Sequence, residues 1–109
     1  MALTEKGWRQ NEGYLYAVDL FNAEYWWEAH EAWERLWRLE TPEEPVALFL
    51  QGLIQLAAAR LKESQDELRG AEKLTRAALS KLRSLPGVYM GIDGGKIQET
   101  TRRLELMWG

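Results

Sequence analysis

The stretch from Val46 to Leu61 is apolar around nearly its whole circumference when it is drawn as a helix. Its large aliphatic and aromatic residues leave no continuous polar face, and the polar residues that interrupt the run before Arg60 are Gln51 and Gln55. A helix that is apolar on most sides has to be buried against other elements. The chain is therefore predicted to be all-α, with the other helices packed around this central one.

About five antiparallel helices account for the sequence in this prediction, as a single domain spanning residues 1–109. Their packing is expected to be that of helical hairpins, like tetratricopeptide hairpins, in a compact array around the third helix. The predicted helices span approximately residues 8–21 (or 11–21), 24–39, 42–63 and 66–84, and a last one follows Asp93 as its cap. Residues 85–95 are predicted to form a loop because they hold Pro86 and four glycines. No segment of the chain alternates as a strand would.

The charge and composition of the chain narrow the classes of partner. The formal net charge is -3, whereas proteins that coat nucleic acid usually carry a clear basic excess, so no nucleic-acid partner is expected. The N-terminal residues lack an apolar core of signal-peptide length, and the Val46–Leu61 stretch is too short and too interrupted to span a bilayer. The chain has no cysteine for disulfides or thiolate metal ligands. Together these features favour a cytoplasmic protein without a membrane partner.

Residues 25–37 concentrate the side chains that could form a functional site. This segment holds four of the six tryptophans and the single histidine, His30. Glu34 follows His30 by four residues and Trp37 follows Glu34 by three, and residues three or four apart share one face of a helix. The three side chains are therefore predicted to form one ridge at the border of the core.

Gln51 and Gln55 are the expected counterparts of this ridge on the central helix. They are four residues apart, and a buried glutamine needs hydrogen-bond partners. We predict that the second and third helices dock so that both amides meet His30 and Glu34 in one polar pocket. The tryptophans expected to wall this pocket are Trp26, Trp33 and Trp37.

The same residues carry a resemblance to domain-of-unknown-function family 309, a group of small helical proteins of bacteria and archaea. The family's hallmark is a His, any three residues, a Glu, any two residues and a Trp, which His30, Glu34 and Trp37 match. Further similar segments, within about residues 11–93, are Leu20-Phe21-Asn22, Phe49-Leu50-Gln51-Gly52-Leu53-Ile54-Gln55, Pro86-Gly87-Val88 and Gly91-Ile92-Asp93. Where the family often has a glycine after the asparagine, this chain has Ala23. The resemblance implies a divalent metal ion as the candidate cofactor at the hallmark residues, and it implies no particular activity.

A metal-binding protein or a metal-dependent hydrolase is one alternative for this site. A histidine and a carboxylate four residues apart on a helix can chelate one divalent ion, and His30 and Glu34 have that spacing. Zinc usually needs three or four strong ligands. The further candidates are the carboxylates Glu12, Asp19 and Asp93. A zincin peptidase is excluded, because Glu34 stands where that motif requires a second histidine.

Two other interpretations remain open at the level of sequence. The polar cluster is compatible with a hydrogen-bonded network whose role is to fix how two helices dock. The chain is also compatible with a structural interaction protein that uses helix-hairpin surfaces, with a homo-oligomer as one form of it. We favour a small binding or interaction module over an enzyme, with a small ligand or a protein of unknown identity as its partner.

Overall fold

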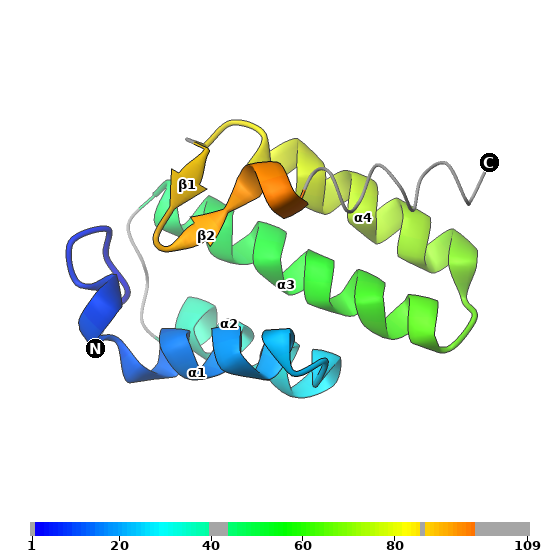
Figure 1. The fold of residues 1–109 in the computed structure, drawn as a ribbon, viewed down its shortest axis with the longest axis horizontal. Coiled ribbons are helices and arrows are strands. Elements are labelled where there is room, and N and C mark those ends of the chain that lie inside the picture. Colours follow the sequence, from blue (N-terminus) through cyan, green and yellow to red (C-terminus); the bar gives the residue numbers. More distant parts are fainter. Residues whose placement is uncertain (1, 40–43, 86, 98–109) are drawn as a thin grey trace.

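A computed structural model of the chain describes residues 2–39, 44–85 and 87–97. Its elements in these ranges are η1 (Trp8–Gln10), α1 (Glu12–Asn22), α2 (Trp26–Leu39), α3 (Val46–Ser64), α4 (Leu68–Leu82), β1 (Val88–Tyr89) and β2 (Ile92–Asp93). Consecutive α-helices run antiparallel, α3 packs against both α2 and α4, and α1 packs on α2 (Figure 1). The predicted all-α array around the third helix is confirmed.

Two of the helix starts are set by side chains that cap them. The Oδ1 atom of Asn11 accepts a hydrogen bond from the backbone N–H of Tyr14 at 3.0 Å, so α1 begins after Asn11. Asp93 Oδ1 accepts one from the N–H of Lys96 at 3.2 Å, and residues 94–97 are helical, as predicted for the start of the last helix. The rest of that predicted helix, and the predicted start of the third helix near residue 42, lie outside the described residues.

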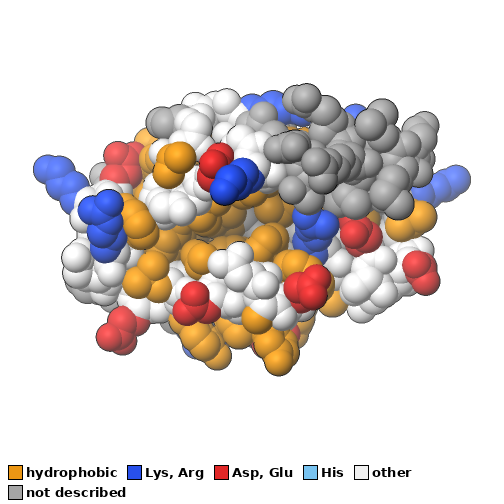
Figure 2. Space-filling view, in the orientation of Figure 1, with side chains coloured by type: hydrophobic (Ala, Val, Ile, Leu, Met, Phe, Trp, Pro, Cys, Tyr) orange, Lys and Arg blue, Asp and Glu red, His pale blue; other side chains and the backbone are white. Residues whose placement is uncertain are grey.

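The core is built around α3, as its apolar circumference requires. Phe49, Leu50 and Leu53 are all buried, together with Trp33 of α2. At Gly52 the α3 backbone approaches α4 so closely that an added Cβ would lie 2.9 Å from the Cδ2 atom of Leu82. Figure 2 shows apolar side chains gathered in the middle of the face where α3 runs, with charged side chains mostly around them. In the described ranges no helix combines the length and apolarity needed to cross a bilayer.

Residues 85–95 differ from their prediction as a loop, because they include an antiparallel hairpin in which Tyr89 pairs with Ile92. The two residues between the strands, Met90 and Gly91, have φ values of 49° and 80°, as a type I′ hairpin turn requires. The Tyr14 hydroxyl donates a hydrogen bond of 2.7 Å to the carbonyl of Met90, which ties the turn to α1. Each strand has only two residues, so the sequence contains no alternation that could predict it.

We predict that Gly91→Ala lowers the free energy of unfolding by about 1–3 kcal/mol. An added Cβ at this left-handed position would lie 2.6 Å from the Trp8 ring, so backbone strain and a steric clash act together. Urea denaturation measures the change. Gly87→Ala is the matched control in the same segment, because among the described residues other than its chain neighbours no atom lies within 4 Å of an added Cβ there. Equal stabilities for the two variants would contradict this account of the turn.

We also predict that Tyr14→Phe destabilises the fold by about 1–3 kcal/mol at neutral pH, because it leaves the buried Met90 carbonyl unpaired. Tyr16→Phe is the control, since Tyr16 is 61% exposed, and it should change stability by less than about 0.5 kcal/mol.

The same tyrosine predicts a pH dependence. Burial, with a smaller contribution from Tyr89, raises the pKa of the Tyr14 phenol above its usual value near 10. The unfolded chain therefore loses this proton first, and stability falls as the pH rises above about 10. The free energy of unfolding, measured by urea denaturation at several pH values above about 10, should fall less steeply with pH for Tyr14→Phe than for the native chain. Equal slopes for the two proteins would contradict a buried phenol with a raised pKa.

Candidate functional site

The ridge predicted on the second helix forms on α2. His30 Nδ1 lies 3.4 Å from Glu34 Oε2, which is within ion-pair range. This contact is not a hydrogen bond, and the buried Nδ1 atom has no hydrogen-bond partner among the described residues. The other oxygen of Glu34 pairs with the guanidinium of Arg38, one helical turn further on. Glu34 is thus shared between an imidazole and a permanent cation.

Trp27 fixes the plane of the His30 ring. The two rings are stacked, with their centroids 5.3 Å apart and their planes 10° from parallel. The His30 side chain is 19% exposed, whereas Trp27 is 51% exposed. The indole therefore covers one face of the imidazole, and the ring edge with Nδ1 stays directed toward Glu34.

A hollow of about 320 Å³ lies where α2, α3 and α4 meet. It is lined by His30, Glu34, Trp37, Gln51, Ile54, Gln55 and Lys81. The five predicted pocket residues on the ridge and its counterpart helix thus lie together in the structure. The hydrogen-bond partner of Gln55 differs from the prediction, however. Its Oε1 atom accepts a hydrogen bond of 2.7 Å from the ammonium of Lys81, and not one from the α2 ridge.

The other two predicted wall residues, Trp26 and Trp33, do not line this hollow. Trp33 is 1% exposed and belongs to the hydrophobic core. Both rings pack against Phe21 of α1, with centroid distances of 4.9 Å for Trp26 and 5.7 Å for Trp33. Trp33 also belongs to the core cluster that includes Leu50 of α3, and the guanidinium of Arg60 of α3 lies 6.0 Å from the centroid of the Trp26 ring, so both rings pack beside the hollow and not along its wall.

The sequence analysis missed two residues that line the hollow, Ile54 and the charged Lys81. Lys81 lies 26 positions beyond Gln55 and on another helix, so no spacing within one helix connects the two. The sequence does hold a weak signal. Lys81 directly precedes Leu82 and follows Ala78 by three positions, and both of these are buried. A long side chain at the border of this inner stripe can reach the neighbouring helix.

The described residues place no third metal ligand beside His30 and Glu34. No group of three or more His, Cys, Asp or Glu side chains comes together within residues 2–39, 44–85 and 87–97. The carboxylates considered as further ligands, Glu12, Asp19 and Asp93, therefore form no such group with His30 and Glu34. The ammonium of Lys81 in the same hollow also opposes a second cation there.

Comparison with protein-family models matches residues 14–74 to the domain of unknown function DUF309. The chain belongs to the DUF309 family. The DUF309 match spans most of α1, all of α2 and α3, and the first half of α4, so it contains every residue of the hollow except Lys81. Comparisons with curated proteins and with solved structures return no match. Membership of DUF309 carries no established activity, so the function has to be argued from the site.

We predict that His30→Ala lowers the free energy of unfolding by about 1–3 kcal/mol, because it removes a largely buried ring that packs on Trp27. Glu31→Ala is the matched control on the neighbouring, exposed position of α2 and should change stability by less than about 0.5 kcal/mol. Urea denaturation followed by circular dichroism compares the two. If His30→Ala is as stable as Glu31→Ala, the imidazole is not part of a packed cluster.

Proposed function

We propose that the chain is a small-ligand binding module, and that its hollow between α2, α3 and α4 takes a compound that carries an oxyanion. The observation that carries this proposal is the Lys81 ammonium, which lies in the hollow beside His30 and the amides of Gln51 and Gln55. Ammonium and amide groups both supply N–H donors, and a pocket rich in donors favours carboxylate or phosphate oxygens.

The balance of charge in the hollow supports an anion rather than a cation. Glu34 is the carboxylate there, and the Arg38 guanidinium already pairs with it. The Lys81 ammonium forms no ion pair with a carboxylate among the described residues. It donates a hydrogen bond to the neutral Gln55 side chain instead. An incoming carboxylate or phosphate would therefore meet an ammonium whose charge is not already neutralised, which favours binding.

The remaining walls of the hollow indicate a ligand with an apolar part. Ile54 lines its α3 side, and Trp37, which is 37% exposed, lines its α2 side. A volume of about 320 Å³ lies at the lower end of the range for small-molecule sites. A compact aromatic or aliphatic carboxylate or phosphate combines the size, the apolar surface and the charge that these residues accept.

His30 Nδ1, which lies 3.4 Å from Glu34 Oε2 without forming a hydrogen bond, distinguishes this proposal from a network that serves only to dock helices. A polar network with a purely structural role is expected to satisfy its buried groups internally. Here a buried imidazole nitrogen next to the hollow has no hydrogen-bond partner among the described residues. Such an atom is suited to a bond that forms when a ligand enters.

The test is isothermal titration of the full chain with benzoate, phenyl phosphate and inorganic phosphate. We expect at least one of these probes to bind with one-to-one stoichiometry, and the difference among them separates carboxylate from phosphate recognition. Lys81→Met should weaken that binding at least about tenfold, or about 1.4 kcal/mol, because it removes the cationic donor.

Lys73→Met is the matched control, because Lys73 lies exposed on the same helix and lines no part of the hollow. It should leave the affinity unchanged. The proposal fails if none of the three probes produces binding heat or a rise in melting temperature at millimolar concentration. It also fails if Lys73→Met and Lys81→Met weaken binding equally.

A further inference from the structure

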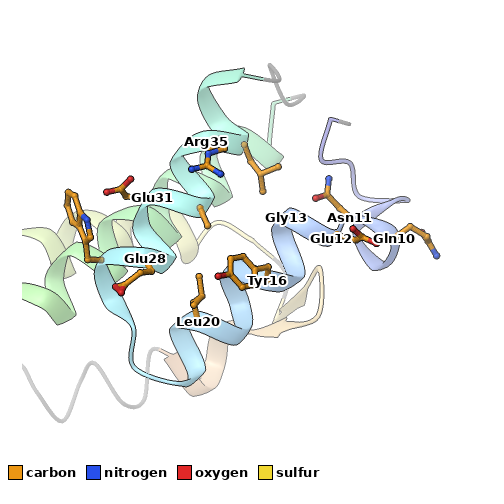
Figure 3. Close-up of a pocket in the computed structure, with 12 residues that line it drawn as sticks. Gln10, Asn11, Glu12, Gly13, Tyr16, Leu20, Glu28, Glu31 and Arg35 are labelled. Carbon is orange, nitrogen blue, oxygen red and sulfur yellow. The ribbon is translucent and has the colours of Figure 1, made fainter.

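A second and larger concave surface lies on the outer side of the α1–α2 hairpin. This groove has a volume of about 850 Å³, with Leu20, Ala32 and Leu36 as apolar residues along it. Figure 3 shows that it is formed by both helices, with Gly13, Tyr16 and Leu20 coming from α1 and Glu28, Glu31 and Arg35 from α2. It lies apart from the hollow, and the two have no lining residue in common.

Large aromatic side chains are exposed along this groove. Tyr16 is 61% exposed and Trp27 is 51% exposed, and both line it. The stack on His30 holds one face of the Trp27 indole, so the exposed surface of that ring has a fixed orientation. Pre-positioned aromatic residues at an apolar groove are typical of protein interfaces, in which Tyr and Trp are enriched.

The charges along the groove indicate which kind of partner fits. Glu12, Glu28 and Glu31 line it, against the single guanidinium of Arg35. Glu12 lies toward one end and Glu28 toward the other, so the acidic groups flank the apolar residues (Figure 3). Complementary charge steers and selects a basic partner. The open faces of Tyr16 and Trp27 also accept Lys or Arg side chains through cation–π contacts.

We infer that the α1–α2 groove binds a basic amphipathic helix of a partner protein. A groove between two antiparallel helices accommodates a third helix, which places its apolar side chains at i, i+3, i+4 and i+7 along it. The 11 residues of α1 span about 16 Å, so about three turns of a docked helix would lie along the groove. Lysines or arginines on the flanks of that helix would meet Glu12, Glu28 and Glu31.

The probe for this inference is a synthetic helical peptide with leucines at i, i+3, i+4 and i+7 and lysines on its flanks, labelled with a fluorophore. Fluorescence anisotropy with the full chain should show saturable one-to-one binding. The same peptide with glutamates in place of the lysines should bind at least about tenfold more weakly, and added salt should narrow this difference.

Two substitutions test whether the peptide occupies the groove. Glu28→Lys should weaken binding of the lysine peptide at least about fivefold, because it replaces attraction by repulsion. Glu44→Lys is the control with the same change of charge, since Glu44 is exposed and lines neither the groove nor the hollow. Tyr16→Ala should also weaken binding, with an unchanged melting temperature because Tyr16 is exposed.

Several outcomes would overturn the inference. These are no saturable binding of the lysine peptide, equal binding of both peptides, or an equal effect of Glu28→Lys and Glu44→Lys. A dimer of the chain alone in light scattering that Glu28→Lys abolishes would identify the occupant as a second copy, whose α4 carries exposed basic residues. Lys81→Met should leave peptide binding unchanged, which keeps this test separate from that of the proposed small-ligand site.

Discussion

The docking of α3 against both of its neighbours is the interaction on which the rest of the structure depends. On one side, Gly52 lets the α3 backbone approach Leu82 of α4, and the ammonium of Lys81, in the preceding position, donates a hydrogen bond of 2.7 Å to Gln55. On the other side, Trp33 joins the buried cluster around Leu50 and so anchors the helix that carries His30. The polar hollow is therefore located at the edge where two apolar interfaces meet, and its geometry depends on their packing.

The α2 helix serves both concave surfaces because only part of its circumference is buried. Ala29, with no exposed surface, faces inward, and the equally buried Ala17 of α1 is small enough to allow the two helices to lie close together. Trp27 lies between the two surfaces, because it lines the groove while its ring stacks on His30 at the hollow. A single stacked pair of rings thus lies between the proposed small-ligand site and the proposed peptide site.

Particular residues show how far the sequence could predict this arrangement. Asp93 was predicted as a cap from the sequence, because a cap depends on a side chain and a backbone N–H three residues away. Asn11 was predicted only as one possible start of the first helix, and the structure shows that it caps α1. The convergence of His30 and Glu34 with Gln51 and Gln55 followed from helical spacing on two amphipathic borders. Trp33 was predicted to wall the pocket, but it lies deeper, in the core beside Phe21 and Leu50, because spacing along one helix does not show which neighbouring side chains surround a buried ring. That the hollow is a binding site remains a prediction.

The sequence by itself determined the helical class, the central position of the third helix and the ridge of His30, Glu34 and Trp37, because these follow from local hydrogen bonding and the period of the helix. Only the tertiary structure decided that Lys81 completes the hollow, that Trp26 and Trp33 pack on α1, and that a groove with exposed aromatic residues opens between α1 and α2. The physical reason is that these features depend on the angle and distance between helices. Those quantities are set by side-chain packing among residues far apart in the chain.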